Sequence, residues 1–189
     1  MDLDETVWDE SLEQLLARYA DEAQVRENLH RKSYYEYKTL TTGFQLPIII
    51  LSALSGSFQF ISKSYQAVEH IITNVTGGVS ILVSIISATA SYLKLGETMS
   101  KHEVAEIAWQ RFYNMIKHEL NLRRDLRQNA MDFLEECKIS YNRLFEISPI
   151  VNQSVINNTK KQIKHNTEFK IPNYLNGYSH TIAFDNGGD

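Results

Sequence analysis

The sequence has one cysteine, no surplus of basic charge and no basic leader. Because Cys137 has no second cysteine to pair with, an intramolecular disulfide is excluded, and a reduced thiol is typical of a cytosolic position. A net charge of -4 offers no basic surplus for neutralising phosphates, which argues against a dedicated nucleic-acid binder. The acidic residues among the first twenty positions do not fit a signal peptide, so we expect no cleaved leader. A length of 189 residues fits one compact unit, with or without a tail.

Charge is almost absent from residues 39–93. Only Lys63 and Glu69 are charged among these 55 residues, which leaves two charge-free runs of 24 and 23 residues. A helix of about 20 residues already spans the hydrocarbon core of a bilayer, which is ~30 Å thick. We therefore predict an antiparallel transmembrane hairpin with spans at 39–62 and 71–93. The alternative, a buried hairpin in a soluble bundle, would need protein on all sides, and the remaining 134 residues are too polar to supply it.

Basic residues flank the predicted spans on one side of the hairpin. Seven of them stand outside the spans, against Lys63 alone in the turn: Arg26, Arg31, Lys32, Lys38, Lys94, Lys101 and Arg111. By the positive-inside bias, we expect both termini to face the cytoplasm, or the interior of whichever compartment inserts the chain.

Polar residues follow both predicted spans at helical spacing. They are Gln45, Ser52, Ser55 and Gln59 in the first span, and Thr73, Thr76, Ser80, Ser84, Ser87 and Ser91 in the second. Intervals of three and four residues place the hydroxyls of the second span on one helix face. Two interpretations remain open: a packing seam between the spans, or the water-lined wall of a pore in an oligomer. Pro47 and Gly43 also predict a bend in the first span, which serves either packing or a gate.

The chain on both sides of the spans is predicted to be helical. Apolar residues recur every three or four positions within 1–38, as in an amphipathic helix. The same spacing runs through 94–148 with a break near Leu120, which predicts one long helix or two joined end to end. We expect an all-α protein in which this cytoplasmic stalk drives homo-oligomerisation. Its packing residues are Val104, Ala108, Phe112, Met115, Leu126, Phe133 and Tyr141.

Residues 149–189 lose the helical spacing. Seven asparagines replace the periodic apolar residues after Ile150, so we predict an extended or disordered tail. One apolar segment, which begins at Phe169 and ends at Leu175, is a candidate docking segment for a protein partner or for the stalk. The alternative is a solvated tail.

No motif for catalysis or for a bound cofactor is visible. The six histidines never pair at intervals of three or four residues, and no glycine-rich phosphate loop occurs. Cys137 fits the apolar spacing of its helix and is best interpreted as a small core residue. We therefore expect no enzyme activity, no cofactor, no metal site and no nucleic-acid partner, but the lipid bilayer as the main partner.

The segment after the second span is KLGETMSKHEVAEIAWQRFYNMIKHEL. Six of its residues stand at helical intervals: Lys94, His102, Ala105, Ala108, Trp109 and Tyr113. Together with the order of elements from residue 7 to residue 145, this segment resembles the SLATT superfamily of two-transmembrane effector proteins. The resemblance implies an oligomeric protein that forms a membrane pore or perturbs the membrane. Stand-alone forms are similar to proteins of large DNA viruses, which implies the alternative of a non-conducting membrane anchor or scaffold, such as a minor capsid protein that links membrane and capsid.

Overall fold

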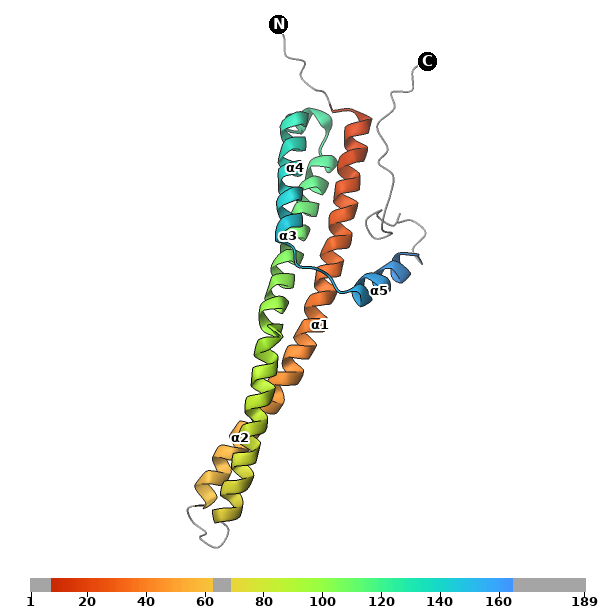
Figure 1. Ribbon diagram of the computed structural model, residues 1–189. Coiled ribbons are helices and arrows are strands. Elements are labelled where there is room, and N and C mark those ends of the chain that lie inside the picture. The colour runs from red at the N-terminus through yellow and green to blue at the C-terminus, as the bar shows by residue number, and fades with distance from the viewer. Residues whose placement is uncertain (1–7, 63–68, 165–189) are drawn as a thin grey trace. The chain divides into compact units, whose positions relative to one another are not determined.

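The computed structural model describes residues 8–62 and 69–164, and its regular elements are helices (Figure 1). In chain order they are α1 (Glu10–Ser62), α2 (Glu69–Tyr92), α3 (Leu95–Asn121), the short 3-10 helix η1 (Arg124–Leu126), α4 (Ala130–Ile147) and α5 (Gln153–Lys164). No β-strand occurs in these two ranges, so the predicted all-α class is confirmed. The candidate docking segment from Phe169 to Leu175 lies outside the described residues.

The chain divides into two compact units. The bundle unit contains residues 1–32 and 104–189, and the apolar unit contains residues 33–103. Helices α1 and α3 each contribute to both units, because each is one continuous helix across the boundary. The predicted boundaries followed the change in hydropathy, whereas these units follow the packing of the helices.

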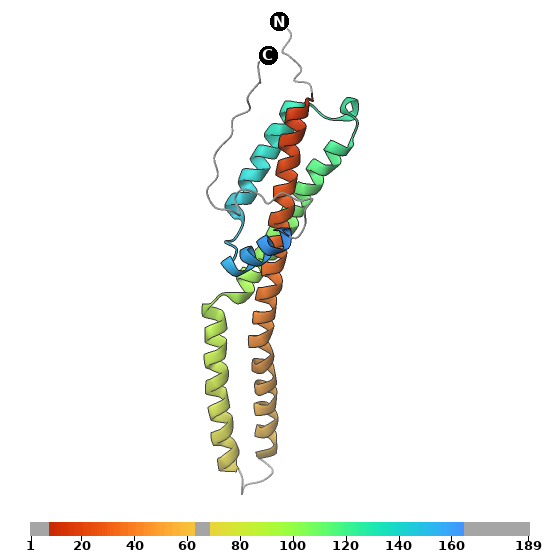
Figure 2. The same cartoon turned by 90° about the vertical axis from the view of Figure 1, so that its right-hand side faces the viewer.

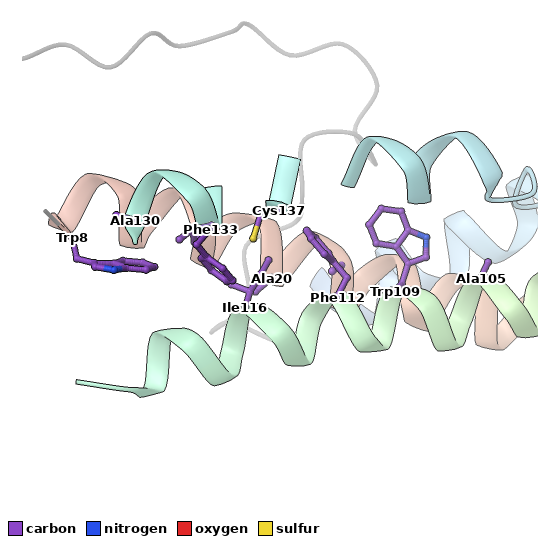
Figure 3. Close-up of a cluster of buried hydrophobic side chains, with 11 residues drawn as sticks. Trp8, Ala20, Ala105, Trp109, Phe112, Ile116, Ala130, Phe133 and Cys137 are labelled. Carbon is purple, nitrogen blue, oxygen red and sulfur yellow. The ribbon is translucent and has the colours of Figure 1, made fainter. Parts of the chain in front are cut away.

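In the bundle unit, α4 folds back on α3 and on the first part of α1. Trp109, in the middle of α3, donates a hydrogen bond from Nε1 to Ser148 Oγ just after α4, at 2.9 Å. At the other end of α4, the Phe133 ring packs on Trp8 with 5.9 Å between the ring centroids. Figure 3 shows core side chains of three helices converging on this interior. The predicted break near Leu120 does separate two helices, but α4 packs back on α3, so the end-to-end arrangement and the single long helix are wrong.

The chain reverses direction within residues 122–129, where the apolar spacing is broken. The Arg127 guanidinium donates to two main-chain oxygens near the end of α3, at 2.9 Å each. Asn129 then caps α4, because its side-chain oxygen accepts hydrogen bonds from two main-chain N–H groups of the first turn. Glu13 of α1 binds both Arg124 and Arg127, and these hydrogen bonds lower the pKa of its carboxyl group to about 2. The loop between α3 and α4 is thus pinned to α1.

This reversal places much of the predicted oligomerisation stripe inside a single chain. Phe112 and Phe133 are 4% and 1% exposed, and Tyr141 stacks on Tyr19 with ring centroids 5.2 Å apart. The other members of the stripe are more accessible: Ala108 and Met115 are half-buried, and Val104 and Leu126 are exposed. The expectation that the whole stripe joins subunits is corrected accordingly, because Phe112 of α3 and Phe133 and Tyr141 of α4 pack inside one chain.

A second correction concerns the predicted tail. Residues 153–164 form α5 rather than an extended segment, and α5 packs on α1 through Val155. Val155, Ile156 and Ile163, with Val151 just before the helix, supply the apolar face of α5, although most of its residues are polar.

Within the described residues two helical segments are long and apolar enough to cross a membrane, Glu10–Ile61 and Glu69–Asn121, and both contribute to the apolar unit. Only 6% of the most apolar window of each is buried. Helix α1 continues through Gly43 and Pro47, so the predicted bend does not interrupt it. After α2, Lys94 adopts a φ of 49° and separates α2 from α3.

The folded-back arrangement predicts unequal effects for two apolar residues of the same predicted stripe. Phe133→Ala should destabilise the bundle unit by about 3 to 5 kcal/mol, because it leaves a cavity in the core. Leu126→Ala should cost less than about 0.5 kcal/mol, because that side chain is 65% exposed. Thermal unfolding of the full chain in mild detergent, followed by tryptophan fluorescence, measures both effects. Equal destabilisation by the two substitutions would contradict the packing of α4 on α3.

Candidate functional site

The apolar unit has a contact surface between α1 and α2, which we call the seam. Figures 1 and 2 both place α2 beside the second part of α1. The seam consists of the residues there that are at least half-buried and recur at intervals of three or four: Thr41, Phe44, Ile48, Leu51 and Ser55 on α1, and Ile72, Thr76, Val79, Val83, Ile86, Ser87 and Ala90 on α2. Most of the seam is therefore apolar.

The ten polar residues singled out in the sequence do not all lie in this seam. Ser55, Thr76 and Ser87 belong to it, and Thr76 is the most buried of them, at 4% exposed. The other seven are exposed: Gln45, Ser52 and Gln59 on α1, and Thr73, Ser80, Ser84 and Ser91 on α2. The packing-seam interpretation therefore accounts for three of the ten residues, and the exposed seven need another explanation.

The exposed polar residues occupy the same flank of the seam on both helices. Successive residues of a helix advance by about 100°, so Gln45 and Ser52 lie about 40° and 20° beyond Thr41 in the sense of helix rotation. On α2, Ser80 and Ser84 lie about 40° and 80° beyond Thr76 in that same sense. Because the chain runs in opposite directions along α1 and α2, equal rotations away from facing surfaces lead to the same side of the helix pair. We call this side the polar face.

The opposite side of the helix pair is mostly apolar. Rotation from the seam in the other sense reaches exposed residues without polar side-chain atoms: Leu40, Leu54 and Phe58 on α1, and Val75, Leu82 and Leu93 on α2. The helix pair is thus amphipathic in cross-section: uncharged polar groups gather on one side, where Ile49 of α1 is also exposed, and the other side is mostly apolar, with Thr89 of α2 as an exposed polar residue.

Hydroxyl groups on the polar face are bonded to their own helix. Ser80 Oγ donates to the main-chain oxygen of Thr76 at 2.9 Å, Ser84 Oγ donates to that of Ser80 at 2.8 Å, and Thr73 bonds in the same way to Glu69. This pattern satisfies each hydroxyl donor inside the helix, so a serine there tolerates an apolar environment. Each oxygen still accepts a hydrogen bond from water or from a neighbouring chain.

Gln45 is the most demanding group of the polar face. Its amide has two N–H donors and an accepting oxygen on an exposed helix surface. Placing such an amide in hydrocarbon without partners costs several kcal/mol, about 2 to 7 depending on the reference state. The polar face is therefore better suited to water or to another polar surface than to lipid tails.

Other kinds of site find little support in the described residues. No group of three or more His, Cys, Asp or Glu side chains there is arranged to hold a metal ion. Cys137 is buried, and burial raises the pKa of its thiol to about 12, which makes it a poor nucleophile. Comparison of the chain with protein-family models, with curated proteins and with solved structures gave no match. The polar face of α1 and α2 is thus the candidate functional site.

Proposed function

We propose that this chain is an integral membrane protein whose two apolar helices cross the bilayer as an antiparallel hairpin. Their length and composition suffice for crossing, and their exposure supports it. A core helix of a soluble protein is mostly buried, whereas Ile49 and Ile50 of α1 and Ile81 and Ile85 of α2 are all more than half exposed. Removing such a side chain from water is worth about 1.5 to 3 kcal/mol, and a bilayer supplies that gain for the whole surface.

The distribution of basic residues supports one orientation of the hairpin. Arg31, Lys32 and Lys38 precede the first span, and Lys94 and Lys101 follow the second. By the positive-inside bias, the bundle unit and both termini lie on the cytoplasmic side.

The polar face supports assembly of several copies around a common centre. In this arrangement Gln45 and the exposed hydroxyls point away from lipid, and the apolar side of each hairpin faces it. Hydrogen bonds between helices in a membrane are typically worth about 0.6 to 2 kcal/mol each, so several along one face stabilise an oligomer. Uncharged hydroxyls give passing solutes weak contacts at many points, as a pore wall requires. The observation that carries the proposal is the gathering of seven exposed polar residues on one side of the pair.

The bundle unit offers a second surface for assembly. A groove of about 400 Å³ lies between α3 and α4, and its lining combines five apolar residues with three polar ones: Ala108, Phe112, Met115, Leu144 and Ile147, with Arg111, Ser140 and Arg143. Exposed Val104 and Ile107 belong to the same part of α3. We propose that the cytoplasmic helices of neighbouring copies contact one another at this groove rather than along the full stripe. Assembly by hairpin and bundle together agrees with the effector function that the SLATT resemblance implies.

A non-conducting anchor or scaffold is the second candidate function. The observation that favours it is the bonding of Thr73, Ser80 and Ser84 to their own helix, since hydroxyls satisfied in this way do not require a pore. In this case the hairpin holds the bundle unit at a membrane, where the bundle binds another protein, for example in a virus particle.

The pore proposal predicts loss of solute flux from substitutions on the polar face. Liposomes that contain the full chain should release a small entrapped dye, and Ser80→Leu combined with Ser84→Leu should reduce the release rate at least tenfold. Ser57→Leu is the matched control, because Ser57 has the same hydrogen bond to its own helix at 2.9 Å but lies away from the polar face. Absence of release by the parent chain at every protein density would instead support the anchor. Equal loss in both variants would contradict the polar face as the pore wall.

The orientation predicts which cysteine reacts with a membrane-impermeant thiol reagent in intact cells. A cysteine that replaces Gln66 should be labelled from outside, and one that replaces exposed Lys138 only after the membrane is opened. Native Cys137 remains in both variants as a silent residue, because it is buried and its pKa is raised to about 12. Labelling of the Lys138→Cys variant in sealed cells would reverse the orientation, and equal labelling of both positions would contradict the hairpin.

A further inference from the structure

Helix α5 is amphipathic and packs on α1 within the bundle unit (Figure 2). Val155 is 7% exposed and packs with Val25 and Leu29 of α1. Lys32 of α1 donates from Nζ to Thr159 Oγ1 at 2.9 Å, and Thr159 is 3% exposed. These contacts determine which face of α5 points outward.

The outward face of α5 is basic. Lys161 and Lys164 are exposed and lie about 120° and 180° from Val155 around the helix axis, on the side away from α1, and half-buried Lys160 borders this side. No acidic residue occurs in α5, and none of the ion pairs among the described residues involves these three lysines. Three positive charges therefore gather on a short surface that no described carboxylate neutralises.

The residues of α1 that hold α5 lie just before the charge-free segment. Lys32 precedes Thr39 by seven residues, and α1 is helical throughout, so this separation is about 10 Å along the helix. The headgroup layer extends about 5 to 8 Å beyond the hydrocarbon core of a bilayer. Charges also act over a Debye length of about 8 Å at physiological ionic strength. Lysines on a helix held at Lys32 are thus within reach of headgroup charges.

We propose that the outward face of α5 binds the anionic headgroups of the bilayer that the hairpin crosses. This inference rests on the proposed membrane insertion and adds a lipid class to it. A lysine ammonium group donates hydrogen bonds to phosphodiester oxygens, and a basic cluster beside a membrane span is a typical binding surface for anionic lipid. Each lysine near such a surface strengthens binding by about fivefold, so three give roughly 100-fold. Through α5, the bundle unit responds to the charge of the leaflet beside it.

The test uses the full chain in lipid nanodiscs made of phosphatidylcholine with about 30% phosphatidylglycerol, which gives the bilayer a negative surface potential. A fluorophore on a cysteine that replaces exposed Asn157 reports contact with a spin label carried on the headgroup of either lipid. We expect strong quenching by labelled phosphatidylglycerol, weak quenching by labelled phosphatidylcholine, and loss of the difference in high salt.

Charge variants separate this contact from a merely structural role of α5. Replacing Lys160, Lys161 and Lys164 by glutamine should weaken quenching by phosphatidylglycerol at least tenfold, and replacing them by arginine should retain it. Lys117→Gln with Lys138→Gln is the control, since both are exposed lysines of the same unit, and quenching should be unchanged.

Four results would overturn the proposal. Equal quenching by the two labelled lipids, or quenching that survives the glutamine variant, contradicts lipid binding by α5 while leaving the membrane proposal in place. Displacement of the phosphatidylglycerol signal by millimolar inorganic phosphate assigns the surface to soluble anions. A chain that does not enter nanodiscs of either composition contradicts the membrane proposal as well.

Discussion

The absence of charge from residues 39–93, apart from Lys63 and Glu69, is the constraint on which the rest of the structure depends. In the proposed membrane hairpin every main-chain polar group needs a partner within the protein, and a helix provides one for each. The same constraint governs its side chains. The hydroxyls of Ser80 and Ser84 on the polar face are bonded to their own helix, and so is that of Ser57 away from it.

The distribution of polar and apolar side chains gives the helix pair two distinct surfaces, the seam and the polar face. Val79 and Val83, with their neighbours in the seam, hold α1 to α2 by apolar contact, which leaves the polar face of each hairpin for a further contact. Outside the charge-free segment, large apolar side chains are buried in a core, as in a soluble protein. There Phe112, Phe133 and Trp109 are buried in a three-helix core, and ion pairs such as that of Glu13 with Arg127 secure its loops. In the proposed arrangement the bundle unit lies in water and the apolar unit lies largely in lipid.

Sequence patterns predict the helices and the limits of the apolar segment. They do not predict which of several faces with the same helical spacing forms the contact between α1 and α2. Thr41, Phe44 and Ile48 have the same helical spacing as the polar residues beside them, so the seam becomes visible only when exposure is known. The loop that reverses the chain after α3 is held to α1 by the ion pairs of Arg124 and Arg127 with Glu13, and such long-range contacts leave only a break in the apolar spacing. Composition hides α5, because a few apolar residues suffice once α1 supplies the matching surface.

The central claim is that the polar face points toward a shared polar interior while the rest of the helix pair faces lipid. A spin label is placed at one position at a time within residues 79–88, in the oligomer reconstituted into a bilayer. The measurement is the collision rate of each label with a water-soluble and with a lipid-soluble relaxation agent. We expect the collision rate with the water-soluble agent to vary with the period of a helix and to be highest at Ser80 and Ser84. The collision rate with the lipid-soluble agent should be highest at Leu82 and Ile85. Maximal contact of Ser80 and Ser84 with the lipid-soluble agent would contradict the central claim.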